Sequence, residues 1–340
     1  MPHKYYNAIN IFYKSQYFPI QRAWNKYGSW IKAWKNLKGE IKIDPDKEWG
    51  RMEKYGIALL LPSDKQFPKI LKEIPLSPFG LYIRGKCEFP SPAIAIVGTR
   101  KATQEGQRIS QKLGYELAEQ NIPVISGLAL GVDQAAHKGA LEIGGKTVAV
   151  LANGLDVVYP HQHENLANKI LENNGAIISE YSIGIPPYPV NFLERNRIIS
   201  GLSVAIIVIE APYGSGALCT AKFAVEQNRE VFVVPGLISQ SNYAGSHNLI
   251  KSGASLITEV NDIFEALNLT LIKDKNRPGK NVNLTKEQQT VLNYIENDGK
   301  SLSVDKITEL TKLEPHVVNQ TIAFLIISGI IKEDKGKYYL

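Results

Sequence analysis

The hydrophobic pattern in the middle of the chain alternates short apolar runs with longer amphipathic stretches. Six runs resemble parallel strands covered on both faces, because they lack polar alternation: Ile94–Val97, Val124–Ser126, Thr147–Leu151, Ile177–Ser179, Ala205–Ile209 and Val231–Val234. Amphipathic segments between them fit helices at Gln104–Gln120, Gly131–Ile143 and His163–Asn173. The alternation predicts an α/β fold, a Rossmann-like doubly wound and mostly parallel sheet, over residues 91–267.

The N-terminal part, residues 1–90, is dense in aromatic residues and lysines. Trp30 and Trp34 lie four apart, and therefore on one helix face, shortly after a break at Gly28 and Ser29. This spacing predicts a small helical domain with a pair of short helices around a glycine turn. The favoured interpretation is that the tryptophans form its core; stacking on nucleic-acid bases is the alternative.

The C-terminal part, residues 285–340, follows a basic, polar linker at residues 268–284 and has the pattern helix, helix, helix, hairpin. Thr285 and Gln288 form a capping box at the start of the first helix. Two more helices fit Val304–Thr311 and Pro315–Ser328, and a turn is expected between strands at Ile330–Glu333 and Lys337–Leu340. The pattern predicts a winged-helix domain.

Composition narrows the classes of protein only modestly. A chain of 340 residues is long enough for two or three domains, and 39 Lys and Arg against 33 Asp and Glu give a net charge of +6, a weak indication of a polyanionic partner. Cys87 and Cys219 are far apart, which excludes a disulfide framework and a zinc module, so no metal is expected. Without a signal-peptide pattern or a membrane-length apolar run, the expected location is the cytoplasm.

Glycines, hydroxyls and arginines follow several of the predicted strands. Because the carboxyl ends of parallel strands meet at one sheet edge, these loops are expected to form a phosphate-binding groove there. The candidate residues are Gly98, Thr99 and Arg100; Ser126 and Gly127; Phe192, Arg195, Asn196 and Arg197; and Gly214, Ser215 and Gly216. The arginines supply forked donors for phosphate, and Phe192 offers a face for a base.

Each of these loops also has a purely structural interpretation. An arginine of the 195–197 stretch would instead be buried against an acid such as Glu180, and the 214–216 loop would be a plain tight turn. Ser126, Asp133 and His137 suggest a hydrolytic triad, but Asp133 and His137 have the spacing of an ordinary helical pair, which is favoured. No dinucleotide fingerprint follows Gly98, so no cofactor is expected and binding is favoured over catalysis.

The order of the motifs resembles the DprA/Smf family. The resemblance is carried by Ile96–Arg100, Ser126–His137, Gly154–Pro160, Ser179-Glu180, Arg195–Arg197, Gly214–Gly216, Val234–Gly236 and Gly245–Ala254. It covers nearly the whole α/β region, and Gly56–Gly85 fits as well. It implies a Rossmann-like domain with an N-terminal SAM-like helical extension and an optional C-terminal winged helix.

The resemblance further implies a homodimer that binds single-stranded DNA, protects incoming DNA and helps load the RecA recombinase in natural transformation. Carried over position by position, Gly98–Arg100 is the principal phosphate contact. Ser126-Gly127, Phe192 with Arg195–Arg197, and Gly214–Gly216 complete the groove. Dimerisation is expected to use the segment Asn242–Phe264.

Two features depart from the family pattern. His161 stands just after Tyr159-Pro160, where many relatives have a basic residue, which reduces positive charge near neutral pH. The third helix of the tail offers His316, Asn319 and Gln320 but no Lys or Arg on its first turns, although recognition helices usually carry basic residues. Direct DNA binding by the tail and protein contact or autoregulation therefore both stay open.

Two other functions compete with single-strand binding. A Rossmann-like phosphoribohydrolase acting on nucleoside monophosphates would use Gly214–Thr220 as its phosphate loop and Glu226 as an acid, but the chain lacks the PGG-x-GT-type loop of such enzymes. A transcription factor using the tail alone would bind duplex DNA in a sequence-specific way. The uncharged third helix argues against that function.

Overall fold

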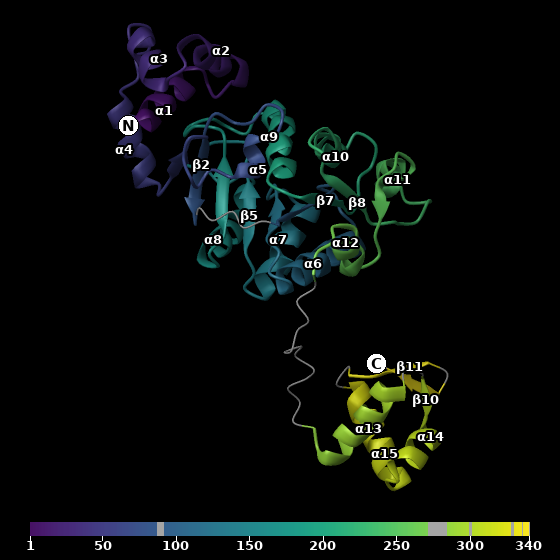
Figure 1. Ribbon diagram of the computed structural model, residues 1–340. Helices are drawn as coiled ribbons and strands as arrows, with labels where there is room; N and C mark the ends of the chain where they lie inside the picture. Colours follow the sequence, from purple (N-terminus) through teal and green to yellow (C-terminus); the bar gives the residue numbers. More distant parts are fainter. Residues whose placement is uncertain (87–91, 271–283, 299–300, 328–329, 335, 340) are drawn as a thin grey trace. The chain divides into compact units, whose positions relative to one another are not determined.

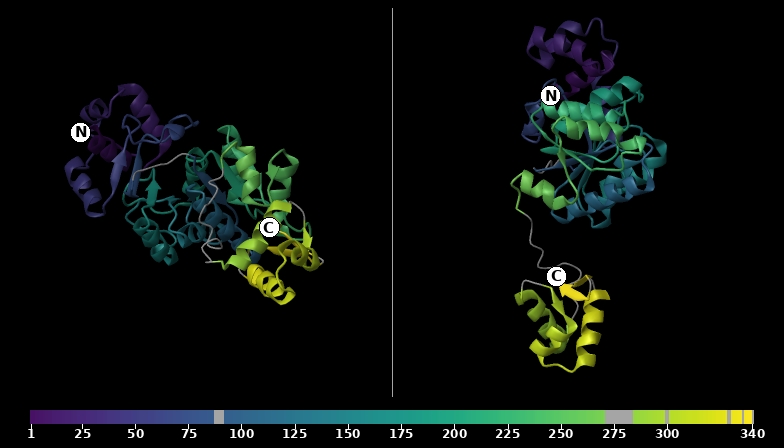
Figure 2. Two further views of the ribbon diagram at one scale, coloured as in Figure 1. Left: turned by 60° about the horizontal axis from the view of Figure 1, so that its bottom comes forward. Right: turned by 90° about the vertical axis from the view of Figure 1, so that its right-hand side faces the viewer.

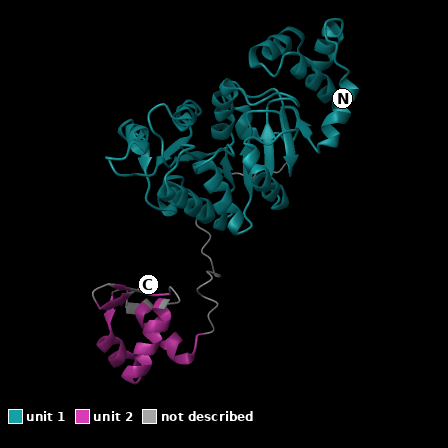
Figure 3. Cartoon of the chain, turned by 180° about the vertical axis from the view of Figure 1, so that it is seen from behind, with its two compact units in different colours: residues 1–271 teal, residues 272–340 magenta. Residues whose placement is uncertain are grey.

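The computed structural model describes residues 1–86, 92–270, 284–298, 301–327, 330–334 and 336–339. They belong to two compact units, residues 1–271 and 272–340 (Figure 3). Within the described ranges, every helix is too short or too polar to span a lipid bilayer. The predicted boundary between residues 90 and 91 falls inside the first unit and stays a prediction.

The first unit begins with the helices α1 (Pro2–Phe12), α2 (Tyr17–Tyr27), α3 (Trp30–Leu37) and α4 (Pro45–Lys54). Gly28 ends α2 with a φ of 62°, a left-handed conformation that glycine adopts without strain, so the predicted helix pair around a glycine turn is confirmed. Trp30 is buried in the helical core against Tyr6, whereas Trp24 keeps 37% of its surface exposed. The interpretation that the tryptophans form the helical core therefore holds for Trp30, whereas Trp24 is only partly buried.

The rest of the first unit is a sheet with helices on both faces (Figures 1 and 2). Its strands are β1 (Ala58–Leu60), β2 (Leu81–Gly85), β3 (Ile94–Val97), β4 (Val124–Ser126), β5 (Thr147–Val150), β6 (Ala176–Ser179), β7 (Ala205–Val208), β8 (Glu230–Val233) and β9 (Ser255–Leu256). Among the described residues they form one sheet in the order β1-β2-β6-β5-β4-β3-β7-β8-β9. The strands from β6 to β9 are parallel, and β1 and β2 add an antiparallel edge.

All of the six predicted strands are present, each within one residue of its predicted ends. The chain runs from β3 outward through β4 and β5 to β6, then returns to β7 on the other side of β3. The order of the sheet thus reverses between β3 and β7. In open α/β sheets this reversal opens a crevice at the carboxyl ends of the strands, where ligands bind.

The helices that cover the sheet carry small and aliphatic side chains toward it. On one face lie α5 (Lys69–Lys72), α9 (Pro189–Gly201), α10 (Gly216–Glu226) and α11 (Ala244–Lys251), packed in one hydrophobic cluster. The other face is covered by α6 (Gln104–Glu119), α7 (Val132–Glu142), α8 (Glu164–Glu172) and α12 (Val260–Ala266). The short 3-10 turns His161–His163 and Ser241–Tyr243 precede α8 and α11.

The second unit contains α13 (Lys286–Asp298), β10 (Leu302–Ser303), α14 (Val304–Thr311), α15 (Pro315–Ile327), β11 (Lys332–Asp334) and β12 (Lys337–Tyr339). Thr285 and Gln288 exchange the two hydrogen bonds of the predicted capping box, at 2.9 and 3.3 Å. The strands form an antiparallel sheet in the order β10-β12-β11. This is the element order expected of a winged helix; most of the predicted linker, residues 271–283, lies outside the described residues.

Candidate nucleic-acid interface

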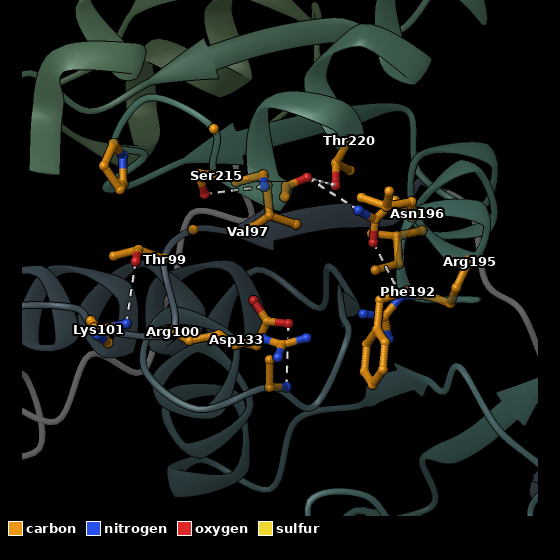
Figure 4. A pocket seen from close by; sticks show the side chains of 18 of the residues that line it. Val97, Thr99, Arg100, Lys101, Asp133, Phe192, Arg195, Asn196, Ser215 and Thr220 are labelled. Atoms are coloured by element: carbon orange, nitrogen blue, oxygen red, sulfur yellow. Dashed lines mark hydrogen bonds between the residues drawn. The ribbon is translucent and has the colours of Figure 1, made fainter. Parts of the chain in front are cut away.

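A cavity of about 640 Å³ opens at the carboxyl ends of β3 and β7, where the sheet order reverses. Most of its lining comes from three segments that are far apart in sequence: Val97–Lys101 after β3, residues of α9, and the loop from Pro212 to the first turns of α10. The remaining lining residues are Ala129, Asp133, Tyr159 and Pro187. Figure 4 shows these side chains arranged around one hollow. We call it the edge cavity, and its lining includes Gly98, Thr99, Arg100, Phe192, Arg195, Asn196, Gly214, Ser215 and Gly216.

The loop after β3 is held in place by its backbone. The Thr99 N–H donates to the carbonyl of Glu210 at 2.7 Å, and the Lys101 N–H donates to the Thr99 hydroxyl at 3.2 Å. Gly98 has no room for a side chain, because a Cβ there would lie 2.4 Å from a methyl carbon of Val132. Arg100 extends from this fixed loop as an exposed side chain, so its guanidinium is available to a ligand.

The buried carboxylate of Glu210 anchors the next turn of the chain. It accepts hydrogen bonds from the Thr103 N–H at 3.0 Å and the Thr103 hydroxyl at 2.5 Å, and from the Asn242 amide at 2.8 Å. These bonds fix the start of α6 directly after the Arg100 loop. Glu210 was not among the residues predicted for the site; its one signal in the sequence was an acid at the end of an otherwise apolar strand.

Phe192 and Arg195 project from α9 into the edge cavity. The Phe192 ring centroid lies 4.8 Å from the Arg100 guanidinium and 5.9 Å from that of Arg195, distances typical of cation–π contacts. Arg195 is 4% exposed and donates to the carbonyls of Gly127, at 3.0 Å, and Val150. Burial lowers the pKa of Arg195 to about 10, with nearby Asp133 acting in the opposite direction, so the side chain is still charged at neutral pH.

Arg197 does not reach the edge cavity, which corrects the prediction that it contacts phosphate. It is 4% exposed and forms a buried ion pair with Glu180 at 2.5 Å. Two residues along a helix turn the side chain by about 200°, so Arg195 and Arg197 point to opposite sides of α9. The alternative interpretation, an arginine buried against Glu180, is the one the structure supports.

Ser126 and Gly127 also lie outside the lining of the edge cavity, contrary to prediction. The buried Ser126 hydroxyl donates to the carbonyl of Ile96 at 2.6 Å. The Arg195 guanidinium fills the space beside Gly127, because a Cβ on Gly127 would lie 2.6 Å from it. Gly127 therefore holds Arg195 in position, and the Ser126 hydroxyl and the Gly127 N–H both donate within the protein.

Asp133 and His137 do not pair with each other either. One Asp133 oxygen accepts from the Gly127 and Ala129 N–H groups at 3.0 and 3.4 Å, while the His137 Nδ1 is 2.7 Å from the Thr147 hydroxyl. Both are buried; burial raises the pKa of Asp133 and lowers that of His137 to about 3. The Ser126, Asp133 and His137 set therefore has no triad geometry.

The loop at Gly214 brings the start of α10 to the edge cavity. The Ser215 side chain caps the helix by accepting from the Ala217 N–H at 3.3 Å, and Gly214 turns the chain with a φ of 74°. The Asn196 amide on α9 donates to the Gly216 carbonyl at 3.1 Å, which ties the two elements together. A helix N-terminus carries partial positive charge and suits an anion such as phosphate.

Several lining residues were not expected from the sequence. Lys101 adds a second exposed cation beside Arg100, and Tyr213, 70% exposed, stands at the rim. Tyr159 meets the edge of the Phe192 ring at a centroid distance of 5.6 Å. A signal for Tyr159 was available, because its Tyr-Pro motif follows β5 at the same sheet edge.

The edge cavity combines cationic donors with aromatic faces. In its described lining, Asp133 is the one carboxylate, and its oxygen is already engaged by backbone N–H groups. Among the described residues no cluster of three His, Cys, Asp or Glu side chains suits a metal ion. The arrangement is suited to holding a phosphate and an adjacent base.

Comparison with known proteins points in one direction. The profile of the family described as DNA recombination-mediator protein A matches residues 58–268. Protein Smf of Escherichia coli is 38% identical over 287 residues, which cover 82% of this chain and 76% of that protein. DNA processing protein DprA of Streptococcus pneumoniae is 40% identical over 202 residues, covering 59% of this chain and 71% of that protein.

Solved structures agree with the sequence matches. The X-ray structure of DNA processing protein A from Streptococcus pneumoniae superposes with a TM-score of 0.60 at 34% identity, covering 69% of this chain and 80% of that one. DNA processing protein A from Helicobacter pylori, studied for its single-stranded DNA binding mode, gives a TM-score of 0.55 at 31% identity, covering 62% and 95%.

Proposed function

This chain belongs to the DNA recombination-mediator protein A (DprA/Smf) family, and from that membership we propose that it binds single-stranded DNA in the edge cavity. Binding is independent of sequence, because the cavity offers cations and ring faces and not a pattern of base-edge donors. The observation that carries the proposal is the meeting of Arg100, the Phe192 ring and the N-terminus of α10 around one cavity.

The proposed contacts follow from this geometry. A phosphate is held by the exposed guanidinium of Arg100 and by the start of α10 at Gly214–Gly216, while Gly98 and Thr99 fix the Arg100 loop. Phe192 and Asn196 border the neighbouring nucleotide. Arg195 contributes positive charge to the cavity, while its Nη1 donates to the carbonyls of Gly127 and Val150 and its Nε donates to the Asn196 amide oxygen.

The test is the salt dependence of single-strand binding by an Arg100→Ala variant. Each phosphate neutralised contributes about 0.7 to the slope of log affinity against log salt, so the variant should bind more weakly with a slope flatter by about that amount. Arg108→Ala is the matched control, because Arg108 is an exposed arginine on α6 already paired with Glu105 at 2.7 Å. Equal slopes for the Arg100 variant and the wild type would remove Arg100 from the site.

A nucleotide-hydrolysing enzyme is less well supported. Its candidate acid, Glu226, is the last residue of α10, whereas the phosphate loop is at the first turn, about 15 Å away for an eleven-residue helix. Glu226 is also exposed and 3.9 Å from Lys222. We therefore propose a binding protein and not an enzyme; release of free base from a nucleoside monophosphate would contradict this.

We further propose that the protein protects incoming DNA in the cytoplasm and helps load RecA, as the description of the family as recombination mediators supports. A homodimer formed through Asn242–Phe264 is consistent with exposed apolar side chains at and near this sheet edge, Leu237, Ile238 and Leu256. Sedimentation tests the dimer, and RecA filament formation on coated single strands, with and without the protein, tests loading.

The role of the second unit stays open between DNA and protein contact. The exposed face of α15 presents His316, Asn319 and Gln320 and no lysine or arginine on its first turns. This favours a protein partner, and duplex binding by the full chain that disappears on removal of residues 272–340 would overturn that preference.

A further inference from the structure

The positive charge of the chain is concentrated in its first helices. Residues 1–43 contain eight Lys and Arg and a single acid, Glu40, a net charge of +7. The other 297 residues contain 31 Lys and Arg against 32 Asp and Glu, a net charge of −1. The excess that attracts a polyanion therefore lies in the N-terminal helices and not in the α/β region that carries the edge cavity.

These cations are presented to solvent without neutralising partners. Seven of the eight are exposed, the exception being Lys4, which pairs with Asp46 at 2.7 Å. Within the part of the chain that the structure describes, the other seven have no carboxylate within 4.0 Å. Arg22 and Lys26 lie four apart on α2, so like charges are neighbours on one helix face, which costs stability unless an anion binds there.

An aromatic cleft of about 620 Å³ opens beside α2. Its ring walls are Tyr17 and Trp24 of α2, Trp30 of α3, and Phe79 from the segment before β2. Tyr17 lies 5.3 Å from Phe79 and Trp24 lies 4.8 Å from Trp30, measured between ring centroids. Lys72 is the one charged residue of its described lining, which contains no carboxylate.

The cleft and the exposed cations lie on different sides of the same helix. Trp24 is 37% exposed, and Arg22 and Lys26, two residues before and after it, are about 160° away around the axis. Gln21 and Asn25, which are polar, fill the solvent-facing arc between the two. A strand with a base in the cleft would therefore pass over Gln21 and Asn25 to reach Arg22 and Lys26, whereas Lys72 belongs to the lining of the cleft itself.

We propose that the aromatic cleft is a second contact for single-stranded DNA, in which one base stacks on Trp24, a neighbouring phosphate meets Lys72, and phosphates further along the strand meet Arg22 and Lys26. Single strands combine an exposed aromatic face with a negative backbone, and protein surfaces that bind them combine aromatic rings with cations. Two other polyanions fit less well. In duplex DNA the base faces are covered by stacking, and an acidic peptide carries negative charge but lacks a regular series of planar rings. The inference rests on the proposed function, because one ligand occupies both sites.

The two sites are connected through α9. Tyr17, on the wall of the cleft, has its ring centroid 5.6 Å from the guanidinium of Arg197, and Arg195 of the same helix lines the edge cavity. Helix α9 therefore separates the two sites within one compact unit. A strand held at both would be bound more tightly than at either alone, because the second contact is intramolecular.

Tryptophan fluorescence tests the cleft directly. All four tryptophans, Trp24, Trp30, Trp34 and Trp49, lie in the N-terminal helices, so the signal reports from this region and not from the edge cavity. An oligothymidylate of about 20 nucleotides should quench it at the same concentrations that raise the anisotropy of the labelled oligonucleotide. Trp24→Phe should lose most of the quenching. Trp34→Phe is the matched control, because Trp34 is half-buried against Tyr5.

Affinity provides the second measurement. Trp24→Ala should weaken binding about fivefold or more, and Arg22→Gln with Lys26→Gln should flatten the salt slope by about 0.7 for each phosphate lost. Arg108→Gln with Lys112→Gln is the control pair, since these exposed cations of α6 already face Glu105 and Glu116. Thermal unfolding checks that each variant is folded.

The outcomes separate this inference from the proposed function. Anisotropy binding by the wild type without quenching, or quenching that persists in Trp24→Phe, overturns the cleft and leaves the edge cavity standing. An absence of any single-strand binding by the wild type overturns both. Quenching that follows binding and disappears with Trp24 supports the second contact.

Discussion

The edge cavity and the aromatic cleft both combine aromatic rings with nearby cations, but the two regions hold these groups differently. In the edge cavity the backbone fixes the groups: Thr99 bonds the Glu210 carbonyl, and Arg195, 4% exposed, is held by two carbonyls. In the cleft the rings are packed together, but Arg22 and Lys26, on the other side of α2, are exposed and have no carboxylate partner among the described residues. In the edge cavity a fixed loop and the N-terminus of α10 define a phosphate position, to which the exposed Arg100 adds its charge. The cations near the cleft provide only an attraction that salt screens.

The difference is sharpest on α9, which contributes to both regions. Arg195 faces the edge cavity, and Arg197, two residues later, faces Glu180 and the Tyr17 ring. Both arginines are equally buried, yet Arg195 lines the edge cavity and Arg197 joins the N-terminal helices to the α/β part through Tyr17 and Glu180. Burial alone therefore does not separate a structural arginine from a site arginine; the direction of the side chain does.

The largest expected effect comes from Arg197→Ala. This change leaves Glu180 buried without its partner and should lower the free energy of unfolding by about 3 kcal/mol. Urea denaturation followed by tryptophan fluorescence measures it in the first unit. At low urea the folded variant should keep the Arg100-dependent part of the salt slope. A slope flattened as in Arg100→Ala would show that Arg197 does contact phosphate.

Compared with Arg197→Ala, Arg195→Ala should lower the free energy of unfolding less and the affinity for single-stranded DNA more. The carbonyls of Gly127 and Val150 lose their donor, which should cost about 2 kcal/mol by the same denaturation measurement. Single-strand affinity should also fall, because the Phe192 ring and the Gly127 loop lose their support. Normal affinity together with normal stability would remove Arg195 from the account of the edge cavity.

The smallest expected effect is a change in pH dependence in Asp133→Asn. Burial raises the pKa of Asp133 above its ordinary value of 3.8, so its contribution favours folding below that pH and is lost as pH rises through the raised pKa. The asparagine oxygen can still accept from the Gly127 N–H without this penalty. The variant should therefore gain stability relative to wild type between acidic and neutral pH. If the free energies of unfolding of the variant and the wild type changed in parallel across that pH range, Asp133 would not have a raised pKa in the folded protein.

Local pattern was sufficient for much of the fold. The apolar runs became strands β3 to β8 because buried parallel strands are continuous in sequence, and the Thr285 capping box formed because all of its bonds are local. The meeting of Gly98–Arg100 with Gly214–Gly216 was also predictable, since it follows from the common edge of parallel strands.

The remaining features depend on contacts between distant segments. The directions of Arg195 and Arg197 follow from Pro189–Gly201 being helical, which the polar sequence around Glu194 did not indicate. Ser126 was predicted at the groove but bonds the carbonyl of Ile96, a partner supplied by the adjacent strand. The antiparallel pairing of β2 with β6 and the aromatic cleft likewise join segments that no local pattern relates.

The most direct test of the central claim is the structure of this chain bound to an oligothymidylate. The account predicts a backbone phosphate within about 3 Å of the Arg100 guanidinium and of an N–H group at the start of α10, with the strand bordering Phe192. A bound strand that leaves the edge cavity between β3 and α10 empty would contradict the account.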